Sequence, residues 1–133
     1  MQRIFKAVAA IFVAAFLATA PAQADQCQDA VQVAMNKSKK HGWDVEDLRG
    51  RFDTIFVGYT GNLDCGDVRR AATSLDKSRW SLSAFMKSCD SLRRSCTAGQ
   101  ADRMIASCDD AIGHSSRMLD DSERLLNNVA GRC

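Results

Sequence analysis

Six cysteine thiols are the side chains of this sequence with the most chemistry to offer. Thiols can pair as disulfides, bind zinc as thiolates or carry out redox catalysis. The two closest cysteines are seven residues apart, so the chain has neither the close pairs of structural zinc sites nor the Cys-x-x-Cys spacing of thiol-disulfide oxidoreductases. We therefore predict that all six form structural disulfides: Cys27, Cys65, Cys89, Cys96, Cys108 and Cys133.

Histidine and serine offer a second chemistry, because a Ser-His-Asp arrangement needs no proximity in sequence. The chain has two histidines, His41 and His114, and the latter precedes Ser115 and Ser116. No Gly-x-Ser-x-Gly nucleophile motif is found. The carboxylate pairs Asp109-Asp110 and Asp120-Asp121 lack the spacing of a calcium loop. We predict no catalytic residue, no metal site and no cofactor, and expect that the protein is not an enzyme.

The N-terminal segment is typical of a secretory signal peptide. Arg3 and Lys6 precede an apolar run, and the small-residue pattern Ala22-Gln23-Ala24 follows it. The sequence thus predicts a signal peptide at 1–24 and one mature domain at 25–133. A secreted or periplasmic location would also oxidise the cysteines.

The charge balance excludes several partner classes. The chain has 18 Lys and Arg against 16 Asp and Glu, and removal of Arg3 and Lys6 would leave 16 against 16. Nucleic-acid binding needs a clustered basic surface, which a neutral domain with interspersed signs does not predict. No stretch after the leader approaches the ~20 apolar residues of a transmembrane helix, so no integral membrane segment is expected in the mature chain.

The elements that must position these residues are helices. The sequence after the leader has no proline, and apolar residues recur at spacings of three and four. We predict an all-α, disulfide-stapled bundle of about five helices. The first covers about 26–40 and stops at Gly42, the second starts at Asp44 with Trp43 packed on Leu48, and the third covers about 64–77. Ser78 caps the fourth, whose inward residues are Leu82, Phe85, Cys89, Leu92 and Cys96. The fifth follows Thr97-Ala-Gly-Gln100 and is either continuous through Gly113 or broken there.

Helix geometry limits the fifteen pairings that six cysteines allow. Cys89 and Cys96 on one helix would lie about 10 Å apart along its axis, beyond the reach of a disulfide. An antiparallel hairpin centred on Ala98-Gly99 would bring Cys89 to Cys108. The same construction with a turn near Ser78 gives Cys65–Cys96, which leaves Cys27–Cys133.

The loop Gly58-Tyr59-Thr60-Gly61-Asn62 is the strongest candidate binding site in the sequence. Two glycines within four residues break the helical pattern, and loops on a cross-linked scaffold are common recognition surfaces. Tyr59 is either an interface anchor or folds back on Phe56, and Trp80 either completes the core or leaves an exposed apolar patch. The candidate binding residues are Tyr59, Thr60, Asn62 and Trp80.

The spacing of the last five cysteines resembles that of elicitins, a family of secreted helical sterol carriers, although the first interval is much longer in this chain. The resemblance implies that a six-cysteine helical bundle can enclose a lipid.

The sequence leaves two functional hypotheses. The first is a binding or inhibitory module that recognises another protein through the 58–62 loop and a helix face. The alternative is a carrier of a small apolar ligand or lipid among apolar side chains: Phe52, Phe56, Trp80, Phe85 and Met104.

Overall fold

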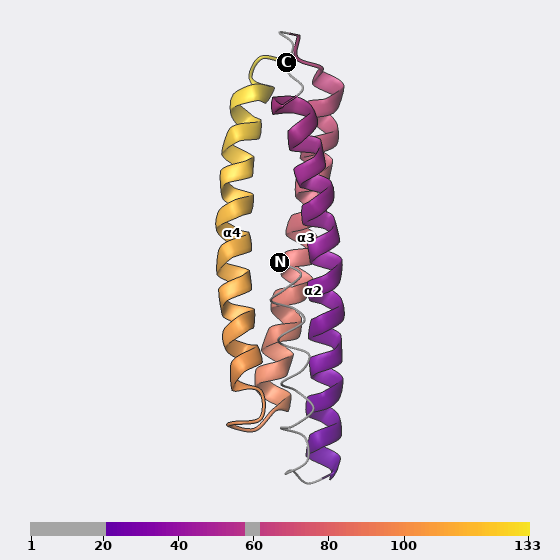
Figure 1. Ribbon diagram of the computed structural model, residues 1–133, viewed down its shortest axis with the longest axis vertical. Helices are drawn as coiled ribbons and strands as arrows, with labels where there is room; N and C mark the ends of the chain where they lie inside the picture. The colour runs from indigo at the N-terminus through magenta and orange to yellow at the C-terminus, as the bar shows by residue number, and fades with distance from the viewer. Residues whose placement is uncertain (1–20, 58–61) are drawn as a thin grey trace.

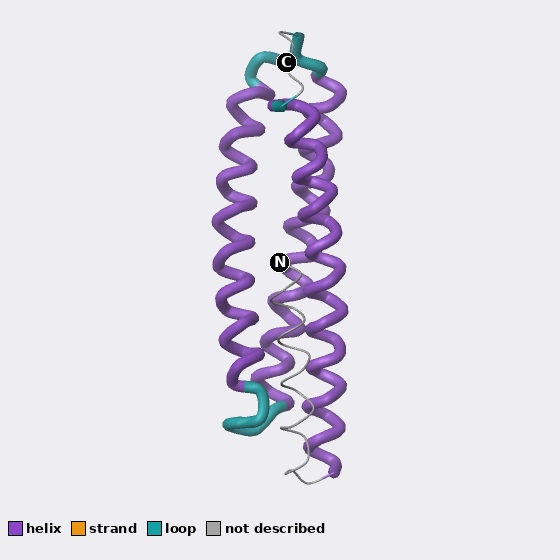
Figure 2. The backbone as a smooth tube through the Cα atoms, viewed as in Figure 1, coloured by secondary structure: helices purple, strands orange, loops and turns teal. Residues whose placement is uncertain are grey.

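The described residues form a bundle of three long helices. The computed structural model describes residues 21–57 and 62–133, with side chains from Asp25 onward. Its helices are α2 (Pro21–Phe56), α3 (Cys65–Ser95) and α4 (Asp102–Ala130), and the described residues form no strand (Figure 1; Figure 2). The all-α prediction is confirmed, whereas the prediction of about five helices is wrong.

The three helices run up, down and up along one elongated bundle (Figure 1). α3 is antiparallel to both other helices and packs against α2 along its length and against α4. Small side chains let α2 and α3 approach closely: Ala30 and Ala34 on α2, with Ala71, Ser74, Ser78 and Ser81 on α3, are all buried. The predicted inward residues Leu82, Phe85, Cys89 and Leu92 of α3 are buried as well.

The predicted break at Gly42 does not occur, because α2 continues through it. A glycine inside a helix costs about 1 kcal/mol relative to alanine. Burial of large apolar side chains on both sides of Gly42, such as Val31 and Leu48, offsets this, since each contributes roughly 1.5–3 kcal/mol. Asp44 is therefore no cap, and its carboxylate pairs with Lys40 Nζ at 2.5 Å.

Ser78 likewise starts no helix. Its Oγ is buried and donates a hydrogen bond to the Ser74 carbonyl at 3.0 Å, the bond that a helical serine makes one turn back. The two segments predicted on either side of Ser78 merge into α3, whose 31 residues span about 46 Å. Gly113 also lies inside a continuous helix, α4.

Helix ends follow the sequence more closely. Asp64 is the N-cap of α3 and its side chain accepts a hydrogen bond from Gly66 N at 2.7 Å. In the α3–α4 connection, Thr97 N donates to Gln100 Oε1 at 2.8 Å, which is one half of the predicted capping box. Gly99 supplies the positive φ of 90° that this turn requires.

Three disulfides hold the bundle: Cys27–Cys96, Cys65–Cys133 and Cys89–Cys108, with Cα–Cα distances of 4.7, 5.8 and 6.2 Å. The pairing Cys89–Cys108 and the absence of a free cysteine are confirmed. The predicted Cys65–Cys96 and Cys27–Cys133 are wrong, because a continuous α3 puts Cys65 and Cys96 at opposite ends of one helix. Each end of α3 is instead bonded to the neighbouring helix that begins or ends there.

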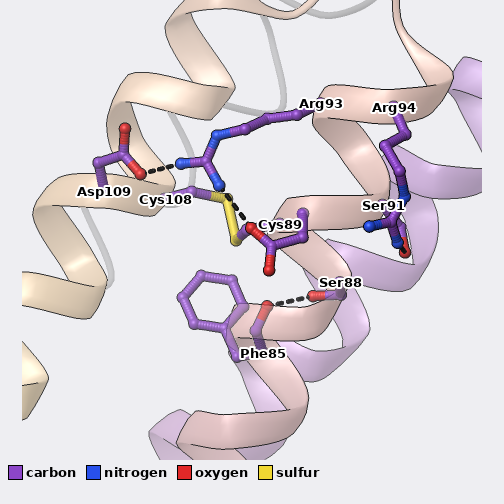
Figure 3. A network of polar contacts seen from close by, with 9 residues as sticks. Phe85, Ser88, Cys89, Ser91, Arg93, Arg94, Cys108 and Asp109 are labelled. Carbon is purple, nitrogen blue, oxygen red and sulfur yellow. Dashed lines mark hydrogen bonds and ion pairs between the residues drawn. A yellow bond between two sulfur atoms is a disulfide. The ribbon is translucent and has the colours of Figure 1, made fainter.

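A charged clamp lies over the disulfide between α3 and α4. Arg93 reaches from α3 to the carboxylate of Asp109 on α4, beside the sulfurs of Cys89 and Cys108 (Figure 3). The same guanidinium contacts Asp90 at 2.8 Å. A second clamp on these helices joins Arg79 to Glu123 at 2.7 Å and to Asp120 at 3.2 Å. Because these groups are largely exposed, their ion pairs add little to stability, and we infer that they mainly orient α4.

Candidate interaction face

The described residues place the predicted binding residues at separate positions. Tyr59 and Thr60 lie outside the described residues. Asn62 is exposed just before α3 begins, and Trp80 is 82% exposed on α3. Because 15 residues of helix separate Cys65 from Trp80, Asn62 and Trp80 are more than about 20 Å apart along the bundle.

Trp43 is a second exposed tryptophan, and the sequence analysis missed it. It was predicted to pack on Leu48, yet its side chain is 64% exposed on α2. On an uninterrupted helix, His41 and Val45 both point inward, so the residue midway between them points outward. The helical period predicts this exposure only for a helix that continues through Gly42, as α2 does.

Trp43 and Trp80 lie at the same level of the bundle. His41 Nδ1 and Ser81 Oγ are 2.9 Å apart and fix the register of α2 against α3. Trp43 follows His41 by two residues and Trp80 precedes Ser81 by one, so the antiparallel helices bring the two tryptophans level.

From the helical period we infer that the two tryptophans also lie on the same side of the α2–α3 pair. A shallow groove of about 230 Å³ runs between these helices and is lined by Asp47, Arg51, Arg69, Arg70, Thr73, Ser74 and Lys77. Trp43 is one helical turn from Asp47, and Trp80 is one turn from Lys77, so each shares the stripe of a groove residue. We call Trp43, Trp80 and the seven groove residues the tryptophan face.

Two contacts of Asp47 fix the base of the groove. Ser74 Oγ donates to Asp47 Oδ2 at 2.6 Å, which ties α3 to α2 at the base of the groove. Arg51 Nε lies 3.7 Å from the other oxygen of Asp47. Arg70 donates a hydrogen bond to Asp67 at 2.5 Å, and this bond raises the pKa of the guanidinium.

A buried polar network behind this face joins all three helices. His41, only 5% exposed, contacts Ser81 Oγ on α3 through Nδ1 and Ser115 Oγ on α4 through Nε2, at 3.1 Å for the latter. Ser81 Oγ donates to the Ser78 carbonyl at 3.1 Å, so it must accept from His41 Nδ1–H. Nε2 is then the acceptor for the Ser115 hydroxyl. Burial lowers the pKa of His41, while Asp44 and the Ser78 carbonyl act in the opposite direction.

The Ser115–His41 pair has the spacing of a nucleophile and its base, but the rest of such a site is arranged differently. The second ring nitrogen faces Ser81 where a triad has a carboxylate. His114, the neighbour of Ser115 in sequence, is exposed. The geometry of this network therefore supports a structural role, which is to hold α2, α3 and α4 together.

The residues named for an apolar ligand site do not converge. Phe85 and Met104 are part of the packed core, whereas Trp80 and Phe56 are exposed. Phe52 contacts Phe56, with ring centroids 5.5 Å apart, at the opposite end of α2 from Cys27. Within residues 21–57 and 62–133, no three His, Cys, Asp or Glu side chains are grouped as metal ligands.

In the part of the chain that the structure describes, no helix is both long and apolar enough to cross a membrane. Searches of protein-family models, of curated proteins and of solved structures find no match to the chain.

Proposed function

We propose that the protein is an exported, disulfide-stapled helical module that binds another protein through the tryptophan face, and that it is not an enzyme. The observation that carries this proposal is the pair Trp43 and Trp80, level with one another on one side of α2 and α3 and 64% and 82% exposed. The 58–62 loop joins these two helices, and Tyr59 remains part of the proposal on sequence grounds.

Exposed tryptophans favour a protein partner for an energetic reason. Tryptophan buries a large apolar area and is enriched among the residues that dominate binding free energy at interfaces. Two such residues on one face of a small domain offer apolar side chains that a partner would cover. Export, proposed from the leader, is compatible with the three disulfides.

Rigidity of the scaffold supports the same proposal. Cys27–Cys96 cross-links α2 to the end of α3, and the Asp47–Ser74 and His41–Ser81 bonds fix the two helices between their ends. A partner therefore meets side chains whose backbone is already ordered, and less conformational entropy is lost on binding.

A comparative pull-down tests the proposal. The oxidised protein would be immobilised and exposed to an extract of its native source, with protein and lipid mass spectrometry of what is retained. The bait variants are wild type, the double variant Trp43→Ala/Trp80→Ala, and the control Leu125→Ala, which removes an exposed apolar side chain from α4.

We expect one protein to be retained by wild type and by Leu125→Ala and to fall at least tenfold on the double variant. Equal retention on all three baits would contradict the tryptophan face. Stoichiometric lipid with no specific protein would instead support the carrier alternative.

A further inference from the structure

We propose that the α2–α3 groove of the tryptophan face binds an acidic peptide segment, with Trp43 and Trp80 contacting apolar side chains beside it. The inference rests on the proposed function, since it names the chemistry of the partner that this face would take. Its elements are four cationic side chains, one fixed carboxylate and two flanking indoles within one stretch of the α2–α3 surface.

The groove lining has a larger excess of positive over negative side chains than the sequence as a whole. The whole sequence carries a formal net charge of +2, whereas the groove lining has four cations, Arg51, Arg69, Arg70 and Lys77, against the single carboxylate of Asp47. Such a local excess attracts an anionic partner at short range even when the whole domain is almost neutral.

Two of the cations are available to a ligand. Arg51 and Arg70 have carboxylate neighbours in Asp47 and Asp67. Among the described residues, no carboxylate lies within ion-pair distance of Arg69 or Lys77. These two side chains, from the same helix, would make the first contacts with a ligand carboxylate.

The dimensions suit a short extended peptide. Arg69 to Lys77 spans eight residues of helix, about 12 Å, which is the length of three or four extended residues. Trp80 lies one turn beyond Lys77, so an apolar side chain next to the acidic residues would meet the indole. Arginine can also bind a carboxylate through two parallel hydrogen bonds, which would orient the segment.

The fixed carboxylate favours a peptide over a nucleic acid. Asp47 is tied to Ser74 at 2.6 Å and cannot turn away from the groove without breaking this bond. It can accept a hydrogen bond from a backbone N–H of a bound peptide, and the sugar-phosphate backbone of a nucleic acid has no N–H to donate. We therefore assign the groove to an acidic peptide.

Fluorescence anisotropy with defined probes tests the assignment. The probe is a fluorescein-labelled peptide of five glutamates followed by phenylalanine, and the comparison probe replaces the glutamates with serines. Affinities would be measured at 50 and 300 mM salt for wild type, for Arg69→Glu/Lys77→Glu and for the control Arg103→Glu/Arg132→Glu, which makes the same change in net charge away from the groove.

We expect the glutamate peptide to bind wild type at least tenfold more tightly than the serine peptide, and more weakly at the higher salt concentration. The groove variant should lose at least tenfold in affinity, while the control stays within twofold of wild type. Equal losses in both charge variants would mean bulk electrostatics and would overturn the groove site, as would tighter binding of an oligothymidylate or of anionic vesicles than of the peptide. Circular dichroism would confirm that all variants remain helical.

The pull-down separates this inference from the proposed function. If Trp43→Ala/Trp80→Ala loses the partner but Arg69→Glu/Lys77→Glu retains it, the face binds a protein and the acidic-segment inference is wrong. If the peptide binds the groove while the partner is indifferent to the tryptophans, the inference stands and the proposed function fails.

Discussion

Burial determines the protonation behaviour of His41. Its two ring nitrogens are used by Ser81 and Ser115, and the neutral ring satisfies both because one nitrogen donates and the other accepts. A charged ring would have to donate from both nitrogens inside the bundle, so Ser115 would need to turn its hydroxyl proton elsewhere. The lowered pKa of His41 expresses this preference for the neutral form.

Because of His41, the free energy of unfolding should decrease as the pH is lowered. Since its pKa in the folded chain lies below the ordinary 6.5, the unfolded chain binds more protons in this range. The free energy of unfolding is then fully retained above about pH 6.5 and decreases as the pH falls from there through the folded pKa. Urea unfolding between pH 8 and 5 should show this decrease in wild type and a smaller one in His41→Gln.

The exposed histidine supplies the control for this measurement. His114→Gln should keep the pH dependence of wild type, because His114 lies outside the network. The same slope in wild type and His41→Gln would show that other groups cause the pH dependence.

Two leucines of α4 test how the core is packed. Leu119 is fully buried, and Leu119→Ala should lower the free energy of unfolding by about 2–5 kcal/mol through lost burial and a residual cavity. Leu125, 51% exposed, should change it by no more than about 0.5 kcal/mol when replaced by alanine. Urea unfolding of the oxidised variants measures both, and similar losses in the two would contradict the orientation of α4.

At the scale of single residues, the sequence predicted types of environment better than partners. Leu82, Phe85 and Cys89 follow the helical period and are buried as expected. The contact of His41 with Ser81 and Ser115 joins residues that lie 40 and 74 positions apart. No local pattern could predict it, because it depends on the register of three packed helices.

Glycines within the long helices lead to a prediction at the scale of the element. A Cβ at the exposed Gly50 would meet no atom within 4 Å, so Gly50→Ala should stabilise the protein by about 0.5–1 kcal/mol by favouring α2. Gly99 has φ of 90°, and Gly99→Ala should destabilise it by about 1–2 kcal/mol. Thermal melts followed by circular dichroism should move in opposite directions for the two variants, and a shift of the same sign would contradict this.

Element type was predictable and element length was not. Gly42 and Ser78 are signals of helix ends in short helices, but both lie within continuous helices of the bundle. Tertiary burial on each side outweighs a local preference of about 1 kcal/mol, and a sequence window does not contain that burial. The error in length then produced the wrong pairings of Cys65 and Cys27, since those pairings assumed a turn near Ser78.

For the whole molecule, the disulfides should carry a large part of the stability. In the chain-entropy model, the 19-residue separation of Cys89 and Cys108 gives about 3 kcal/mol, and the 69-residue separation of Cys27 and Cys96 gives about 4 kcal/mol. Removal of either pair by serine substitution should lower the free energy of unfolding by these amounts in urea unfolding. A loss below about 1 kcal/mol for both pairs would contradict the model.

Full reduction tests the same feature more severely. A domain of this size is stable by about 5–15 kcal/mol, so loss of all three bonds should remove most of that margin. The helical circular dichroism signal at 37 °C should decrease strongly after reduction. A cooperative melt near the oxidised midpoint would show that the helices do not depend on the disulfides. Non-reducing peptide mapping should recover the three linked pairs: Cys27–Cys96, Cys65–Cys133 and Cys89–Cys108.

Each of the three disulfides has one cysteine in α3 or at its end. One bond ties this helix to α2, at Cys27, one to α4, at Cys108, and one to Cys133, just after the end of α4. A protease that cuts the backbone within 58–61 or within 97–101 therefore does not separate α2, α3 and α4, because disulfides still join them. The nicked protein would differ from the intact one by the mass of one water until it is reduced. Both connections can thus be cleaved without taking the bundle apart, which suits a protein proposed to work outside the cell.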